Sequence, residues 1–233
     1  MSRRTICFFA LGLTLTLATT APAAEHEEPI VIYPAGSEPQ PPPSPVCWDG
    51  PIAHLGEVRV HSATKTVTAT GWVNQTHGAI ELLACGPKGK VHECVFVLSV
   101  NPIDLQAALL LAGLKGGEPM PDLGKGPPTG SPVDIFVEWD ADGDLRRERA
   151  ETFIWQIKED AVLPNAPWIF NGSMVKEGRF MGFAEESLVA TYWDPYALIN
   201  INHPAGANDE ALHANPRQVP PYGTPITMHF IPR

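Results

Sequence analysis

Apolar and polar residues alternate along several short stretches of this chain. In residues 66–73 and 133–139 every second position is apolar, which is typical of a half-buried strand. The same kind of pattern, or a short run of apolar residues, predicts further strands at 57–61, 79–85, 91–100, 168–170, 188–193 and 226–231. Because Gly86-Pro87-Lys88-Gly89 separates two of these apolar runs, it predicts a hairpin.

One stretch has the pattern of a helix. Asn101 can cap it, Pro102 fits its first position, Asp104 suits the positive end of the helix dipole, and Gly113 provides a stop. Residues 102–112 are apolar nearly all round, so they predict a buried core helix that is too short to span a bilayer. With strands outnumbering helices and most joined by short turns, we expect an α+β fold with a mainly antiparallel sheet. Residues 116–132 hold five glycines and five prolines and predict a long surface loop.

We expect the first 51 residues to lie outside the globular domain. Arg3 and Arg4 precede an apolar stretch, and Ala21-Pro22-Ala23 follows it, which predicts a signal peptide over residues 1–23. Residues 24–51 contain eight prolines and predict a semi-rigid spacer. Residues 52–233 are then a single globular domain. We therefore expect a soluble protein, exported to the periplasm or secreted.

Charge and cysteine content limit the expected partners and the expected disulfide bonds. The formal net charge of −10 becomes −12 once the two arginines of the signal peptide are removed, which argues against nucleic acid as a partner. Of four cysteines, Cys47, Cys85 and Cys94 remain in the mature chain. Cys85 and Cys94 flank the predicted hairpin, so they are the expected disulfide; a bridge from Cys47 to either one, or no bridge, stays open.

Several motifs, in one order, resemble the YdjY-type domain of bacterial exported proteins. They are GAIELLACGPKGKVHE (78–93), NPIDLQAALLLAGL (101–114), PVDIFVEW (132–139), PWIFNGS (167–173), ATYWDP (190–195) and GTP (223–225). The resemblance covers roughly residues 60–231. The family has no established activity, so the resemblance implies a domain type and no reaction. Some members occur beside ferredoxin-like iron–sulfur sequences, but this chain lacks that cysteine spacing.

A candidate reactive site lies beside the predicted hairpin. His92, Glu93 and Glu81 could converge on one side of it, and a histidine with a carboxylate can act as a general base or bind a metal. The register is not readable from the sequence, and a shift of one residue would send the side chains to opposite faces. The alternative is a solvated hairpin end with an ion pair to Lys88 or Lys90.

A second candidate depends on cleavage before Ala24. The new terminus Ala24-Glu25-His26 would offer its amine, two amides and the His26 imidazole as a four-nitrogen site for Cu(II) or Ni(II). No other cofactor is predicted.

Taken together, the residues favour a non-enzymatic binding module of the cell envelope. Its partner would be a small molecule, a polysaccharide or an envelope protein, and the mature chain would have no membrane span. The alternative is a metal-assisted hydrolase using His92, Glu93 and Glu81. Signature motifs of nucleophilic hydrolases and zinc proteases are missing, which weighs against an enzyme.

Overall fold

A computed structural model describes residues 39–233 of the chain. The predicted signal peptide, most of the proline-rich segment and His26 lie outside the described residues. The strands are β1 Val46–Asp49, β2 Ile52–Leu55, β3 Val58–His61, β4 Val67–Val73, β5 Leu82–Cys85, β6 Cys94–Leu98, β7 Ser131–Ala141, β8 Asp144–Arg149, β9 Ile154–Gln156, β10 Ala161–Val162, β11 Trp168–Phe170, β12 Val175–Lys176, β13 Arg179–Phe180, β14 Ser187–Ala190, β15 Ile199–Ile201, β16 Leu212–Ala214 and β17 Pro225–Pro232. The α-helices of this part are α1 Pro102–Leu111 and α2 Met181–Ala184.

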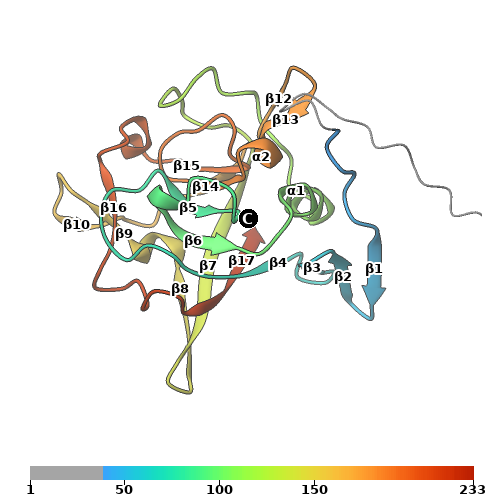
Figure 1. Cartoon of the computed structure of the whole chain (residues 1–233), viewed down its shortest axis with the longest axis horizontal. Helices are drawn as coiled ribbons and strands as arrows, with labels where there is room; N and C mark the ends of the chain where they lie inside the picture. The colour runs from blue at the N-terminus through green and yellow to red at the C-terminus, as the bar shows by residue number, and fades with distance from the viewer. Residues whose placement is uncertain (1–38) are drawn as a thin grey trace, which may run out of the picture. The chain divides into compact units, whose positions relative to one another are not determined.

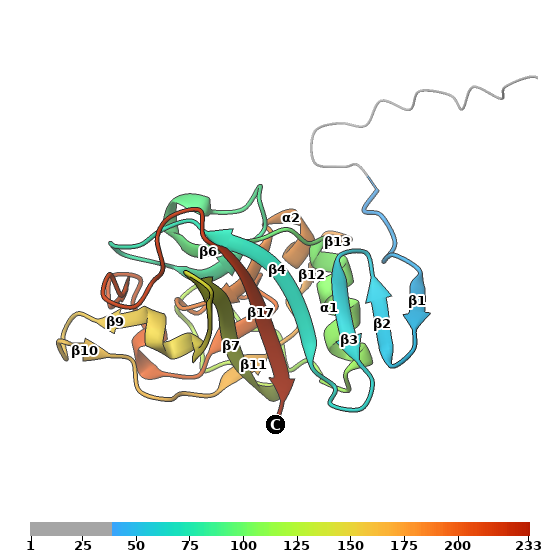
Figure 2. The same cartoon turned by 90° about the horizontal axis from the view of Figure 1, so that it is seen from below.

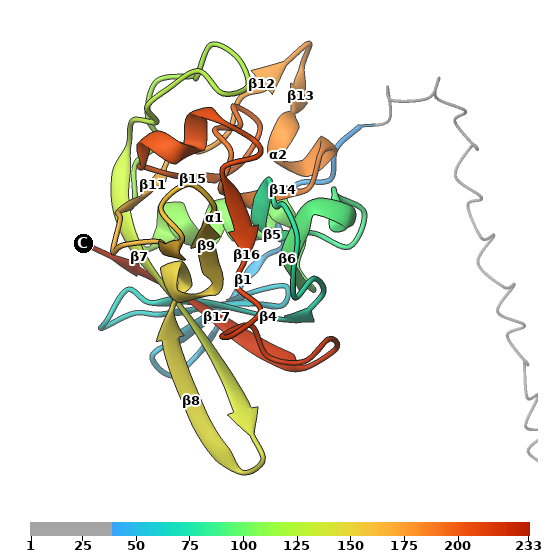
Figure 3. The same cartoon turned by 90° about the vertical axis from the view of Figure 1, so that its left-hand side faces the viewer.

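Eight of these strands close into a barrel. The order is β4-β17-β7-β11-β15-β14-β5-β6, and β6 pairs back onto β4. Strands β3, β2 and β1 continue the sheet outward from β4, and β8 extends it from β7 (Figures 1 and 2). The small sheets β10-β9-β16 and β12-β13 lie beside it, and the β7–β8 hairpin projects from the body (Figure 3).

The predicted α+β class with a mainly antiparallel sheet is wrong. The described residues are mostly β, and the closed sheet buries its own inner face, so it needs no layer of helices to cover it. Closure depends on β4 pairing with both β6 and β17, which lie far from each other along the chain. Local patterning identified the strands, but pairings between distant segments leave no local signal.

The longest strands show how the core is built. In β7, Val133, Ile135 and Val137 are buried, while the residues between them are more exposed. Opposite them in β17, Phe230 pairs with Ile135 and Met228 with Val137. The alternation predicted for both stretches therefore places one face of each strand in a continuous core.

The connection between β5 and β6 is not a hairpin. The two strands are neighbours but run parallel, with Leu82 opposite Cys94 and Cys85 opposite Val97. After residues 86–89 the chain passes through a 3₁₀ turn, Val91–Glu93, and the Glu93 carbonyl accepts a hydrogen bond from the backbone N–H of Glu81. The segment from Gly86 to Glu93 thus carries the chain from the end of β5 back to its start. Strand β6 begins there and runs in the same direction as β5, so the two apolar runs do not pair antiparallel.

Helix α1 forms where the sequence predicts it. The Asn101 side chain accepts a hydrogen bond from the Ile103 N–H, and Gly113 adopts a positive φ of 100° just past the end. The helix packs against β2, β3 and β4, burying Leu105 and Leu109, while Leu110 is 50% exposed. Helix α1 is therefore buried on one side only, not all round.

The proline-rich segment contributes to the compact unit. Strand β1 lies within the stretch predicted as a spacer and pairs with β2. Upstream of it, the backbone N–H and hydroxyl of Ser44 both donate to the carboxylate of Asp104 in the first turn of α1. Among the described residues, no helix has the length and hydrophobicity to cross a membrane.

Candidate functional site

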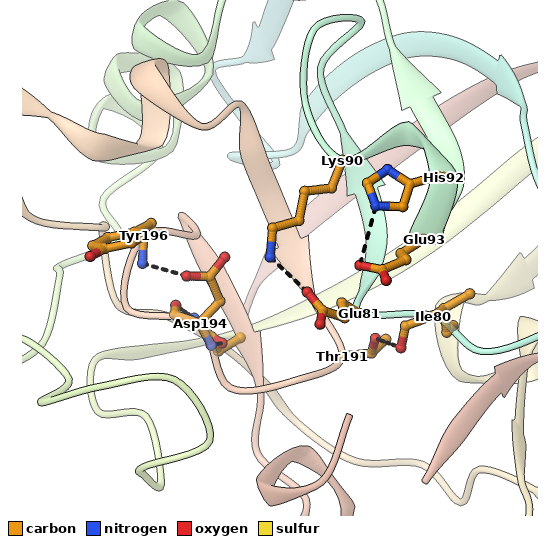
Figure 4. A network of polar contacts seen from close by, with 9 residues as sticks. Ile80, Glu81, Lys90, His92, Glu93, Thr191, Asp194 and Tyr196 are labelled. Atoms are coloured by element: carbon orange, nitrogen blue, oxygen red, sulfur yellow. Dashed lines mark hydrogen bonds and ion pairs between the residues drawn. The ribbon is translucent and has the colours of Figure 1, made fainter. Parts of the chain in front are cut away.

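The three residues predicted to form a reactive site come from two short segments. Glu81 immediately precedes β5, whereas His92 and Glu93 belong to the 3₁₀ turn that precedes β6 (Figure 4). Backbone hydrogen bonding brings the segments side by side, as described above. Glu81 and Glu93 both line a small cavity of about 140 Å³, together with Asp209 and Glu210.

His92 does not join this cavity. Its Nε2 lies 3.8 Å from a carboxylate oxygen of Glu93, and its side chain is 73% exposed. Ion pairs with this much exposure hold their partners weakly, because water screens the charges. The structure therefore brings Glu81 and Glu93 together and leaves His92 at the surface.

The Glu81 carboxylate is engaged by a lysine. Lys90 Nζ lies 2.7 Å from Glu81 Oε2, the ion pair that the sequence offered as the alternative reading. Partial burial acts to lower the pKa of Lys90, but the hydrogen bond and charge of Glu81, with help from Asp194 and Glu93, raise it above its usual value. The ammonium lies between the carboxylates of Glu81 and Asp194 (Figure 4).

Asp194 is the buried acid of this network, and it was not among the candidate residues identified from the sequence. It is 4% exposed, and burial raises its pKa, although the Tyr196 N–H and the nearby Lys90 favour the ionised form. Tyr196 donates its backbone N–H to Asp194 Oδ1 over 2.8 Å. The sequence signal that could have identified Asp194 is its position as the one charged residue of the motif at 190–195.

Asn200 connects Asp194 to the rest of the barrel. Its Oδ1 accepts from the Asp194 N–H, and its Nδ2 donates to the Asp194 carbonyl and to Asn171 Oδ1. Asn171 in turn donates to the Ala197 carbonyl. These contacts join β15 to the segments that follow β11 and β14, so the network is placed to hold this part of the sheet together. Among the described residues, no three His, Cys, Asp or Glu side chains are grouped so as to hold a metal ion.

The predicted Cys85–Cys94 disulfide is not formed, and all three described cysteines are free thiols. In the parallel pairing, Cys85 lies opposite Val97 and Cys94 opposite Leu82, so the two are not cross-strand partners as a hairpin would make them. Both are fully buried, whereas Cys47 is exposed on β1. Burial, together with hydrogen bonding to the neighbouring Cys85 thiol, raises the pKa of Cys94 well above its usual value.

Thiol reactivity should follow this burial. We expect iodoacetamide to label Cys47 in the folded protein and to reach Cys85 and Cys94 only in denaturant, because a thiolate must be accessible to react. Intact mass and peptide mapping, without reductant, distinguish the outcomes. Labelling of Cys85 or Cys94 in the folded protein, or their failure to label in denaturant until reductant is added, would contradict the structure.

A larger concave site lies beside α1. This α1 groove has a volume of about 620 Å³. Its apolar lining consists of Pro41, Ile103, Pro119, Met174, Val175 and Phe180, and its polar lining of Gln40, Gln106 and Ser173. Sequence reasoning missed it, because its walls come from four separate segments.

Two glutamines shape the α1 groove. The Gln40 side chain makes two hydrogen bonds to the backbone of Phe180, donating from Nε2 over 2.9 Å and accepting at Oε1 over 2.6 Å. Gln106 donates to the Gly172 carbonyl over 3.2 Å, while its Oε1 is buried with no hydrogen-bond partner. The first holds one wall in place, and the second leaves an acceptor unsatisfied beside the groove.

Comparison with known proteins shows the family to which this chain belongs. No curated protein and no solved structure matches the chain significantly. A family model described as the YdjY domain matches residues 58–231, which includes every strand of the barrel. The chain therefore belongs to the YdjY domain family.

Proposed function

We propose that this protein is an exported, non-enzymatic binding module of the cell envelope that binds a small, largely apolar molecule in the α1 groove. The observation that carries the proposal is the groove itself. Small-molecule sites are typically concave, between about 300 and 1,000 Å³, and mostly apolar with a few placed polar groups. The α1 groove, at about 620 Å³, has each of these features. Export is inferred from the first 23 residues of the sequence.

The lining indicates what kind of molecule fits. Six apolar side chains offer contact area, and none of the lining residues carries a formal charge. Gln106 lines the groove and its Oε1 is buried without a hydrogen-bond partner, so a ligand that carries a hydrogen-bond donor and reaches this amide through a side-chain rotation would relieve a cost of about 1–3 kcal/mol. An apolar ring or chain with one N–H or O–H group satisfies both conditions.

The predicted reactive residues favour binding over hydrolysis. Glu81 is held by Lys90, and His92 lies at the surface without a contact to Glu81. A general base must lie within hydrogen-bond reach of the proton that it removes, in a position that a substrate can share. His92 has no such enclosed position.

A fluorescent probe tests the proposal. N-phenyl-1-naphthylamine is neutral, apolar and has one N–H donor, and its emission rises in an apolar site. We expect saturable binding of one probe per chain. Val175→Asp should weaken binding at least tenfold, because it places a charge in the apolar wall at a position that is 68% exposed in the folded protein and so tolerates the change.

Val162→Asp is the matched control. Val162 lies on β10, away from the α1 groove, and is also exposed, so the same substitution there should leave probe binding unchanged. Near-ultraviolet circular dichroism confirms that both variants are folded. The proposal fails when the wild-type protein does not bind the probe, or when Val175→Asp binds it as tightly as Val162→Asp does.

A further inference from the structure

A second groove lies on the outer face of the sheet, and its chemistry differs from that of the α1 groove. It has a volume of about 540 Å³ and is crossed by β2, β3, β4, β17 and β8. The polar side chains that matter are Arg59, His61, Thr66, Thr68, Arg147 and His229. We call it the basic groove, because two arginines line it and none of its lining residues is acidic.

Strand pairing places these side chains on one face. Arg59 is directly opposite Thr68, and Thr68 is directly opposite His229. Directly paired residues point to the same side of a sheet, so the three form a row across β3, β4 and β17, which lie side by side in Figure 2. The residues that alternate with them, such as Val67 and Met228, are buried in the core. The row therefore faces outward.

The two arginines of the groove have no acidic partner. Neither Arg59 nor Arg147 takes part in an ion pair among residues 39–233. Arg147 instead stacks over the ring of Phe136, 4.8 Å from its centre. In a protein with a formal charge of −10, two unpaired guanidinium groups lining one groove create a local positive field that the net charge conceals.

Two acids lie near the groove. Asp134 accepts from Arg149 and from Arg233, each over 2.6 Å. Glu138 is directly opposite Arg147 on β7 and lies 3.7 Å from Nε2 of His229, but it forms no ion pair with Arg147. Among the described residues, Arg59 and Arg147 therefore stay unpaired, while the carboxylate of Glu138 weakens the positive field beside Arg147.

The spacing of the arginines sets the shape of that ligand. Arg59 is on β3 and Arg147 on β8, separated by β4, β17 and β7. Four inter-strand steps amount to roughly 19 Å between the backbones, a gap that the two long side chains narrow. The two arginines thus extend into the groove from strands on opposite sides of it, so an elongated ligand can pair one acidic group with each of them. The threonine hydroxyls between them, at Thr66 and Thr68, can donate hydrogen bonds along the floor.

We propose that the basic groove is a second binding site, independent of the α1 groove, for an elongated anion with at least two acidic groups. One group pairs with Arg59 and another with Arg147, while the threonine hydroxyls contact the part in between. Guanidinium groups bind carboxylate and phosphate alike through paired hydrogen bonds, so the shared chemistry is a polyanion that carries either group.

Isothermal titration calorimetry with three probes tests this site. Trigalacturonate carries carboxylates on a sugar chain, tripolyphosphate carries linked phosphates, and inorganic phosphate carries one acidic group. We expect at least one of the two elongated anions to bind at least tenfold more tightly than inorganic phosphate, and the tighter of the two identifies the acidic group preferred. Arg59→Ala and Arg147→Ala should each weaken that binding at least tenfold, and raised salt should weaken it too.

Arg146→Ala is the matched control. Arg146 is on the same strand as Arg147, but its pairing with Trp139 places it on the opposite face, and it is paired with Asp144. The same loss of charge there should change the affinity less than twofold. Equal affinity for phosphate and both elongated anions, or unchanged affinity in Arg59→Ala and Arg147→Ala, would overturn the proposal. Naphthylamine binding in these two variants should stay as in the wild type, which separates this site from the α1 groove.

Discussion

Replacing Asn200 with alanine lowers the free energy of unfolding by about 3 kcal/mol, as we expect from the loss of its side-chain hydrogen bonds in a fully buried position. Asn200 Oδ1 accepts from the Asp194 N–H over 2.7 Å, and its Nδ2 donates over 2.8 Å to the Asp194 carbonyl and over 3.0 Å to Asn171 Oδ1. Alanine removes all three contacts and leaves the Asp194 and Asn171 groups buried without these partners. Urea denaturation measures the change.

Asn202→Ala provides the comparison. Asn202 is two residues further along, its side chain is exposed, and its backbone N–H, which bonds the Pro167 carbonyl, is unaffected by the substitution. We expect a change within about 0.5 kcal/mol. If Asn200→Ala is no more destabilising than Asn202→Ala, then Asn200 does not hold Asp194 and the strands around it in the way the contacts indicate.

Gly71→Ala should also destabilise the protein by about 3 kcal/mol, through a clash at the seam of the barrel. Gly71 lies on β4 where that strand pairs with both β6 and β17, opposite Leu98 and Ile226. A methyl group at this position would overlap the backbone carbonyl of Val97, which cannot move without shifting β6. Alanine also makes the unfolded chain less flexible, but that gain is only about 0.4–1 kcal/mol, so the clash dominates.

The neighbouring Thr70→Ala tests whether the effect belongs to the seam. Thr70 is on the same strand and exposed, so its truncation should cost about 0.5 kcal/mol or less. Urea denaturation followed by near-ultraviolet circular dichroism reports both stability and packing. A Gly71→Ala variant as stable as the wild type would mean that β4 and β6 do not approach this closely, and the closed order of eight strands would then be wrong.

Local signals in the sequence identified α1 and most strands of the barrel. The Asn101 cap, Pro102 and the Gly113 stop predicted α1 to within a residue or two. The alternation at 133–139 and 226–231 predicted β7 and β17, and both strands extend a little further than expected. These predictions succeeded because capping and alternation act between residues close together in the chain.

The same local signals did not predict the direction of the strands or which strands pair. The apolar runs on either side of residues 86–89 were identified correctly, but the prediction that they pair as a hairpin was wrong, because β5 pairs antiparallel with β14 and parallel with β6. A run of apolar residues looks alike whichever way its neighbour runs. The expected Cys85–Cys94 bridge depended on that hairpin and is not formed in the structure.

The candidate sites divide in the same way. Glu81, Glu93 and Lys90 were identified from the sequence because they lie within 13 residues of one another, and they meet in the structure. The sequence did not identify the buried Asp194, the α1 groove or the basic groove. The contacts of Asp194 and the walls of both grooves come from segments that are distant along the chain.

The sequence by itself determined α1, most strands of the barrel, the family and the strong excess of negative charge, because local patterning, motif order and composition are properties of the chain. Only the tertiary structure decided that the sheet closes and that Arg59 and Arg147, 88 positions apart, line one groove. A net charge of −10 argued against nucleic acid as a partner. Strand pairing nevertheless concentrates two unpaired arginines on one face, since electrostatic recognition depends on where charges lie and not on their sum.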